Sequence, residues 1–126
     1  MTWDELAIDL LKAAKAMLET HPRSSASRAY YAGHIALAKA LEEHGFVPDR
    51  GYSTQQHRRQ SSLIGQHLGH LGLNGVRELR RMMSRLYARR IDADYVRRVT
   101  IDRQIALESV RDASAVFVAL GIQEAA

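Results

Sequence analysis

Residues 24–44 constrain the fold most, because this stretch is predicted to be a helix with two buried faces. At helical period, one face carries large side chains, among them Tyr30, Leu37 and Leu41. The other face carries only small ones: Ala29, Ala32, Gly33, Ala36 and Ala40. A helix that is apolar all round is usually a central one. We therefore expect the rest of the chain to pack around this helix.

Three polar side chains interrupt the apolar character of this helix. Arg28 lies beside the large-residue face, and Tyr31 and His34 lie within it. Polar groups that are buried in a fold need hydrogen-bond partners there. We therefore treat Arg28, Tyr31 and His34 as candidate binding residues.

Further helices are predicted on both sides of the central one. Thr2 and Glu5 have the spacing of a capping box, so a first helix is expected from Thr2 to about Thr20, where His21-Pro22 breaks it. A weaker third helix is predicted over residues 55–71, and the Asn74-Gly75 turn signal indicates that a fourth begins there. Thr100 is predicted to cap a last helix that Gly121 ends. No strand pattern or linker appears, which indicates one all-α domain over residues 1–126.

Charge is concentrated in the middle of the chain. Residues 50–98 contain eleven arginines against three acidic residues, a local net charge of +8 in a chain whose total is +4. Arginine has a planar fork of donors that suits phosphate and carboxylate. Both a solvated charged face and a surface that attracts an anionic partner are consistent with this pattern.

The predicted fourth helix places its arginines in two ways. Its polar face holds Arg77, Arg81, Arg85 and Arg89 at four-residue spacing. Arg90 instead falls at the centre of the apolar face, and Asp94 follows one turn later on the same side. An inward arginine must be paired or must line a cleft. Two interpretations stay open: an internal Arg90–Asp94 salt bridge packed against Tyr95, or an accessible polar site around Arg90.

Several classes of site and location are disfavoured by the sequence. The chain has no cysteine, and no carboxylate accompanies His67 and His70, so neither a disulfide nor a metal site is expected. No glycine-rich phosphate loop follows a strand, and no cofactor is predicted. No apolar run approaches the ~20 residues of a membrane span, and the acidic first residues do not resemble a signal peptide. We expect a cytoplasmic protein without membrane contact.

Two short motifs, taken together, resemble the HEPN family (higher eukaryotes and prokaryotes nucleotide-binding). They are SRAYYA in the central helix and RIDADY at residues 90–95, separated by a segment that contains His57, Gly65 and His67. The resemblance covers the chain from about Leu10 to Gly121. It implies an antiparallel up-and-down bundle of four to five helices that commonly forms a homodimer. It also implies a prokaryotic toxin–antitoxin component paired with a minimal nucleotidyltransferase, or a metal-independent RNase.

The RNase members of this family carry an arginine followed after four to six residues by a histidine, often with a tyrosine nearby. Here Arg90 and Tyr95 match, but no histidine follows Arg90. Cleavage of RNA without a metal needs a general base, a general acid and a cation. Arg90 would supply the cation and His34, His57 or His67 the acid or base. The catalytic candidates are therefore Arg90, Asp94, Tyr95 and His57, none of them fixed by a motif.

Three functions follow as hypotheses. The first is a dimeric nucleotide- or RNA-binding module or toxin–antitoxin component that uses Arg90, Asp94 and Tyr95 together with the arginines of the fourth helix. The second is an endoribonuclease with a substituted site. The third is a protein-interaction scaffold whose arginines bind an acidic partner. For the dimer, either the small-residue face of the central helix or its Tyr31/His34 side is expected to form the two-fold contact.

Overall fold

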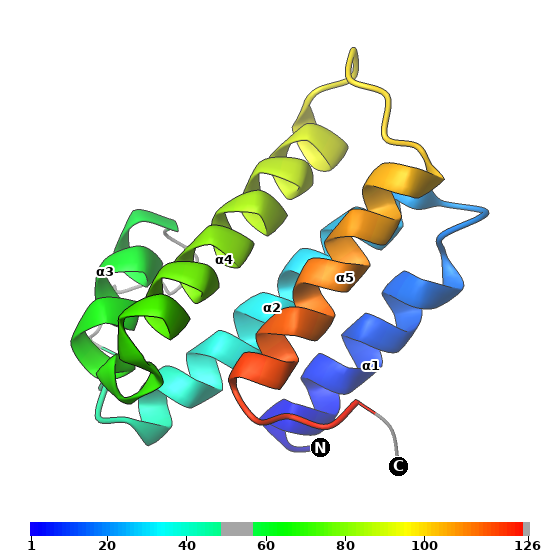
Figure 1. Ribbon diagram of the computed structural model, residues 1–126. Helices are drawn as coiled ribbons and strands as arrows, with labels where there is room; N and C mark the ends of the chain where they lie inside the picture. The colour runs from blue at the N-terminus through cyan, green and yellow to red at the C-terminus, as the bar shows by residue number, and fades with distance from the viewer. Residues whose placement is uncertain (49–56, 125–126) are drawn as a thin grey trace.

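The computed structural model describes residues 1–48 and 57–124, and the side chains of His57 and Arg58 lie outside that part. Its elements are α1 (Trp3–Ala16), α2 (Pro22–Glu43), α3 (His57–His67), the short 3-10 helix η1 (Gly69–Leu71), α4 (Gly72–Tyr95) and α5 (Arg103–Ala119). The four long helices α1, α2, α4 and α5 run alternately up and down, and α3 lies beside the first turns of α4 (Figure 1). No strand occurs among the described residues, which confirms the all-α prediction.

Helix α2 is central, as predicted: it packs against α1, α4 and α5. Its small-residue face is buried, with Ala29 and Ala32 fully covered. Gly33 allows α4 to come close, because a Cβ atom at this position would lie only 3.1 Å from the Leu86 Cδ1 atom. This face of α2 is therefore used inside one molecule, and it is not available as the two-fold contact that the sequence suggested.

The main core lies where α1, α4 and α5 meet α2. Its largest fully buried side chains are Leu11, Tyr30, Leu37, Leu41, Ile64, Leu68, Leu79, Met83, Leu86 and Phe117. Complete burial of one such aliphatic or aromatic side chain contributes about 1.5–3 kcal/mol. The packing of α2 against α4 fixes the first half of α2 relative to the last turns of α4.

The first helix boundary follows local chemistry. Thr2 and Glu5 form the predicted capping box, with the Thr2 N to Glu5 Oε2 distance 2.8 Å and the Glu5 N to Thr2 Oγ1 distance 3.1 Å. Helix α1 ends at Ala16, however, and not near Thr20. Pro22 then occupies the first turn of α2, where its missing N–H costs nothing. The chain is thus turned sharply between α1 and α2, as His21-Pro22 predicted.

Three other boundaries differ from the prediction. Helix α3 spans His57–His67 and ends before residue 71, with η1 as a separate element after it; residues 55 and 56 of the predicted helix lie outside the described part. Helix α4 begins at Gly72, whose φ of +79° suits glycine, so Asn74 and Gly75 lie inside the helix and do not form a turn. Asp102, not Thr100, caps α5 by accepting a 2.9 Å hydrogen bond from the Ile105 N–H. The turn predicted at Asn74-Gly75 is therefore wrong, and the predicted cap of the last helix is displaced by two residues.

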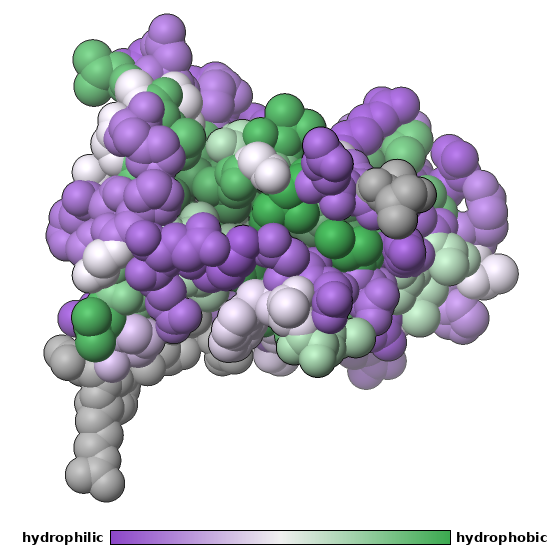
Figure 2. Space-filling model, turned by 90° about the horizontal axis from the view of Figure 1, so that it is seen from below, coloured by the Kyte–Doolittle hydropathy of each residue, from purple (hydrophilic) through white to green (hydrophobic). Residues whose placement is uncertain are grey.

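The start of α1 and the segment that follows α5 lie at the same end of the bundle (Figure 1). Seen from this end, apolar side chains gather in the middle and hydrophilic ones surround them (Figure 2). The opposite end carries the connection between α4 and α5. Within residues 1–48 and 57–124, no helix combines the length and the apolar character needed to cross a bilayer.

Candidate functional site: an arginine–tyrosine groove

An open groove of about 640 Å³ lies between the first half of α2 and the last turns of α4. Its walls are formed by Leu10, Arg23, Ser24, Ser27, Arg28, Tyr31, Arg90, Ala93, Asp94 and Tyr95. Five of the candidates named from the sequence therefore meet at one place: Arg28, Tyr31, Arg90, Asp94 and Tyr95. They come from two helices that are about sixty residues apart in the chain and that the core packs together.

Arg90 is the central group of this groove. Its Nη2 donates a 2.8 Å hydrogen bond to the Tyr31 hydroxyl and a longer one, 3.4 Å, to the Tyr95 hydroxyl. Its Nε lies 3.0 Å from Asp94 Oδ2. The side chain is only 18% exposed. The sequence left two interpretations open, an Arg90–Asp94 salt bridge or an accessible polar site around Arg90. The structure has both, because the ion pair lies in the wall of an open groove.

Aromatic rings surround the guanidinium of Arg90. Its central carbon lies 5.8, 5.4 and 5.3 Å from the ring centroids of Tyr30, Tyr31 and Tyr95. Such distances allow cation–π attraction. Burial by itself lowers the pKa of Arg90, but Tyr31, Tyr95 and Asp94 outweigh burial and raise the pKa. Arg90 is therefore a fixed positive charge in the wall of the groove.

His34 lies behind the groove and not in it. It is 4% exposed, its Nδ1 contacts the Gln60 side-chain amide, and its ring stacks on Tyr30 at a centroid distance of 5.8 Å. Burial, together with the positive charge of Arg90, lowers the pKa of His34 to about 4. His34 is consequently neutral at pH 7 and packed in the interior, where a ligand in the groove does not reach it.

Arg23 is a groove residue that the sequence analysis missed. Its Nη1 donates to the carbonyl oxygens of Asp92 and Ala93, both at 3.0 Å, and its Nη2 donates to the carbonyl oxygen of Val99. These acceptors belong to the end of α4 and to the segment after it, where carbonyl groups lack partners within the helix. Arg23 stands in the first turn of α2, where the helix dipole disfavours a cation. An arginine at this unfavourable position could have been predicted from the sequence to have a hydrogen-bond partner outside its own helix.

Two more residues complete the wall from α2. Ser27 Oγ donates a 3.2 Å hydrogen bond to Asp94 Oδ2, which ties the end of α4 to α2. Arg28 is exposed, and its Nε lies 3.3 Å from Met17 Sδ. Arg28 is therefore the third arginine of the groove wall, after Arg90 and Arg23, and it is exposed to solvent.

A family model for the HEPN domain matches residues 1–123, nearly the whole chain. The chain belongs to the HEPN family. The comparison with curated proteins and the comparison with solved structures each gave no significant match. The resemblance suggested by the SRAYYA and RIDADY motifs is thus confirmed at the level of the family.

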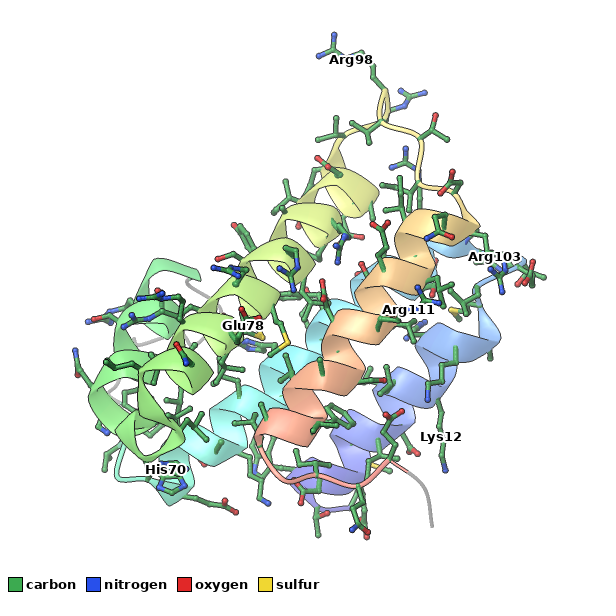
Figure 3. The ribbon with its side chains drawn as sticks, in the orientation of Figure 1. Lys12, His70, Glu78, Arg98, Arg103 and Arg111 are labelled. Atoms are coloured by element: carbon green, nitrogen blue, oxygen red, sulfur yellow. The ribbon has the colours of Figure 1, made fainter. Side chains whose placement is uncertain are left out.

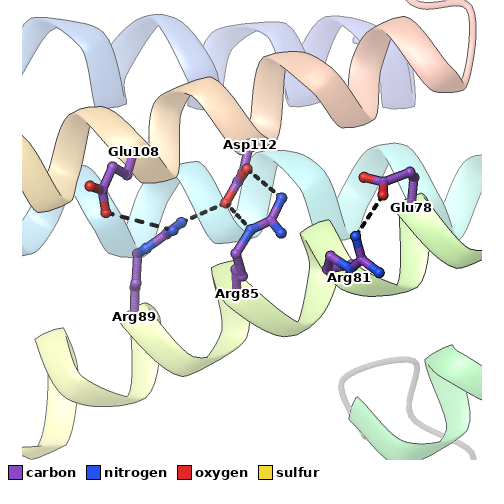
Figure 4. Close-up of polar contacts among 6 residues, drawn as sticks. All are labelled: Glu78, Arg81, Arg85, Arg89, Glu108 and Asp112. Atoms are coloured by element: carbon purple, nitrogen blue, oxygen red, sulfur yellow. Dashed lines mark hydrogen bonds and ion pairs between the residues drawn. The ribbon is translucent and has the colours of Figure 1, made fainter.

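The other arginines of α4 in this HEPN domain do not form one free stripe. Arg85 makes two hydrogen bonds to Asp112 of α5, from Nε at 3.1 Å and from Nη2 at 3.0 Å, and Arg89 Nη1 binds the same carboxylate at 2.7 Å. Figure 4 shows these pairs together with the separate Arg81–Glu78 pair within α4. Arg77 is exposed. Two of the four predicted binding arginines thus join α4 to α5.

Asp112 is held as a carboxylate by these contacts. Burial favours its neutral form, but the hydrogen bonds from Arg85 and Arg89 outweigh burial and lower the pKa of Asp112. Its side chain is 14% exposed, and that of Arg89 is 18% exposed. This cluster is a closed, charge-balanced joint between two helices.

Three other histidines, His44, His67 and His70, do not line the groove. The His67 Nδ1 atom lies 3.2 Å from the His44 carbonyl oxygen, and the rings of His44 and His70 stack at 4.2 Å. His70 is at the end of the bundle opposite the α4–α5 connection (Figure 3). His57 begins α3, but its side chain lies outside the described residues. Among the side chains that the structure does describe, no group of three histidines or acids is arranged to hold a metal ion.

Proposed function

We propose that this HEPN domain binds a phosphate-bearing ligand, RNA or a nucleotide, in the groove around Arg90. The observation that carries the proposal is the state of Arg90, which is a fixed cation, mostly buried, in the wall of an open groove. Its Nη1 makes no hydrogen bond to any residue in the described part of the chain. The N–H groups of Nη1 are therefore available to donate hydrogen bonds to a phosphate oxygen.

The surroundings of Arg90 support this proposal. Tyr95 is 67% exposed, so one face of its ring is available for a nucleobase to stack on. Arg28 stands at the rim and adds positive charge. Arg98 projects from the connection between α4 and α5, next to the end of α4 (Figure 3). The positive charge that the sequence places in residues 50–98 is thus partly gathered around this end of the bundle.

Binding is better supported than cleavage. An RNase needs a proton acceptor and a proton donor at the reacting phosphate. Among the described groove residues there is no histidine, and His34 is buried with a pKa lowered to about 4, so only the Asp94 carboxylate and the hydroxyls of Tyr31 and Tyr95 are left as acid–base groups. The endoribonuclease with a substituted site is therefore kept as an outcome of the test below.

The test is a fluorescence-anisotropy titration of a short single-stranded RNA and of a nucleotide at several salt concentrations. We expect affinity to fall steeply with salt, as phosphate contacts require. Arg90→Ala should remove most of the affinity. Arg77→Ala is the matched control, since it removes the same charge from an exposed site of the same helix, and it should have little effect.

Two results would redirect the proposal. If neither ligand binds at low salt, the proposal is refuted and the scaffold hypothesis, in which the arginines bind an acidic protein partner, takes its place as the one to test. If labelled RNA is cleaved in EDTA by the wild type and not by Arg90→Ala, the protein is an enzyme. Intact RNA together with Arg90-dependent binding supports a binding module.

Membership of the HEPN family also supports a finer proposal, a homodimer that acts as a toxin–antitoxin component with a minimal nucleotidyltransferase. The small-residue face of α2 is covered within one molecule, so the two-fold contact must lie elsewhere. Light scattering should give twice the 14.2 kDa mass of the chain, and a monomer at micromolar concentration would refute the dimer. Co-expression with a nucleotidyltransferase encoded next to this protein, followed by co-purification, tests the partner.

A further inference from the structure

The Arg90–Asp94 ion pair involves one nitrogen of Arg90, Nε, and one oxygen of Asp94, Oδ2. Asp94 Oδ2 lies 3.0 Å from Arg90 Nε and also accepts the Ser27 hydroxyl at 3.2 Å. Asp94 Oδ1 makes no hydrogen bond within residues 1–48 and 57–124, although the side chain is 29% exposed. A carboxylate oxygen is thus kept as an acceptor at the groove.

Arg90 likewise has one nitrogen that is bonded within the protein and one that is not. Its Nη2 is taken by the hydroxyls of Tyr31 and Tyr95, while Nη1 has no partner in the described chain. Because the two residues are one helical turn apart, their side chains lie on the same side of α4, and both line the groove. The groove therefore presents a cationic donor next to an anionic acceptor.

This pair restricts what a ligand must offer. A phosphate is attracted by Arg90 but repelled by the carboxylate of Asp94, so the group that meets Asp94 has to be a hydrogen-bond donor. A ligand of matching chemistry carries a hydroxyl beside a phosphate. In an RNA chain, the ribose 2′-hydroxyl has this position relative to the 3′-phosphate, and DNA lacks it.

We propose that Asp94 accepts a hydrogen bond from a ribose 2′-hydroxyl and that it makes the groove selective for RNA over DNA. This inference rests on the proposed function, since it assumes that Arg90 holds the neighbouring phosphate. Ser27 acts as a positioning residue, because its 3.2 Å bond to Oδ2 restrains the carboxylate of Asp94 in the groove wall. Plain attraction between arginines and phosphates would not distinguish the two nucleic acids.

The experiment compares three short single strands of one sequence at one salt concentration: RNA, DNA with deoxyuridine in place of thymidine, and 2′-O-methyl RNA. These differ only at the 2′ position, and the methylated strand keeps the oxygen but loses the donor. The wild type should prefer RNA by about tenfold, the factor given by one hydrogen bond to a charged group. The 2′-O-methyl strand should bind as weakly as DNA.

Asp94→Ala should lower the RNA:DNA affinity ratio to about one. Its affinity for DNA should stay the same or rise, since a repulsive charge is removed; a misfolded variant would not behave in this way. Asp92→Ala is the matched control, because Asp92 lies in the same helix but not in the groove wall, and it should keep the preference for RNA. Ser27→Ala should reduce the preference in part.

The outcomes separate this inference from the proposed function. Equal affinity of the wild type for RNA and DNA, with both lost in Arg90→Ala, would overturn the role of Asp94 and leave the phosphate groove standing. A preference for RNA that persists in Asp94→Ala, or a 2′-O-methyl strand that binds as well as RNA, would also overturn it. Absence of binding by any strand would refute both proposals.

Discussion

Arg89 and Arg90 are neighbours in the chain, and their side chains are equally exposed, at 18%. Arg89 faces α5, where Asp112 binds it at 2.7 Å and Glu108 lies 3.8 Å away. Arg90 faces α2, where it meets two tyrosine hydroxyls, together with an acid from its own helix whose second oxygen remains unused. The two arginines are therefore equally buried, but Arg89 has two acidic partners and Arg90 has only one.

On the proposed function, partners and not burial separate the structural arginine, Arg89, from the one proposed to bind a ligand, Arg90. A buried charge is tolerated when an opposite charge and hydrogen bonds compensate its desolvation. The Arg85–Arg89–Asp112 cluster meets this condition within the protein. The Arg90 cluster meets it only in part, and an anionic ligand would complete it. The predictions below test this difference, from the largest expected effect to the smallest.

The strongest contrast is expected in ligand affinity. Arg90→Ala should weaken RNA binding by about 100-fold, because a desolvated charge contact is lost. Arg89→Ala removes the same charge from the adjacent residue and should change the affinity by about twofold at most. Anisotropy titrations of both variants at one salt concentration measure the difference. Equal losses would mean that the general charge of the helix, and not the groove, attracts RNA.

For the free energy of unfolding, the larger effect is expected from the Arg85–Arg89–Asp112 cluster and the smaller one from the Arg90 cluster. Asp112→Asn should lower the free energy of unfolding by about 2 kcal/mol, because Arg85 and Arg89 lose their carboxylate. Asp94→Asn should cost less than about 0.5 kcal/mol, since its contacts are more exposed. Urea unfolding at pH 7 compares the two variants, and a larger loss in Asp94→Asn would reverse the assignment of roles.

The pH dependence of the Asp112 effect has a definite sign. The pKa of Asp112 is lowered in the folded state, so its contribution is complete above the pKa of an unfolded aspartate, about 3.9. It is lost as the pH falls through the lower folded pKa. The stability difference between wild type and Asp112→Asn should therefore be constant from pH 7 to about pH 5 and shrink only below pH 4.

His34 gives a pH effect in a different window. Its pKa is lowered to about 4 in the folded state, whereas an unfolded histidine titrates near 6.5. Between these values the unfolded chain binds more protons, so stability falls as the pH is lowered from about 6.5 to 4. His34→Gln should reduce the stability loss between pH 7.5 and pH 5 by about 2 kcal/mol. An unchanged pH profile would show that His34 is not buried as a neutral ring.

The smallest effect is expected at the hydroxyl that orients Arg90. Tyr31→Phe removes the 2.8 Å acceptor of Nη2 and should weaken RNA binding about fivefold, the value of one hydrogen bond. Tyr95→Phe removes only the 3.4 Å contact and should have less effect on affinity. A larger effect at Tyr95 would indicate that its hydroxyl binds the ligand directly.

Much of the fold was predictable because its signals are local. The capping box of Thr2 and Glu5, the break at His21-Pro22 and the two buried faces of α2 each depend on residues a few positions apart. Asn74-Gly75 was misleading, since packing of α4 overrides a turn preference and Gly72 already supplies the positive φ. Thr100 and Asp102 are both suitable caps, so their sequence did not determine which of them begins α5.

The site was predictable only in part, for a physical reason. Helical period was enough to turn Arg90 inward and to place Asp94 beside it, because both positions belong to one helix. The period also grouped Arg77, Arg81, Arg85 and Arg89, but it contained no information about the helix opposite them. Asp112 and Arg23 act across helix–helix contacts between residues far apart in the chain. Such pairing depends on the three-dimensional packing and not on spacing in one segment.

Titration of the protein with a short single-stranded RNA, followed by the NMR signals of the arginine Nε–Hε groups, tests the central claim most directly. Arg90 and Arg89 are covalent neighbours with equal exposure, so each serves as the reference for the other. We predict that the Arg90 signal shifts in proportion to bound RNA while those of Arg85 and Arg89 stay in place. A shift of Arg85 and Arg89 with Arg90 unchanged would contradict the account.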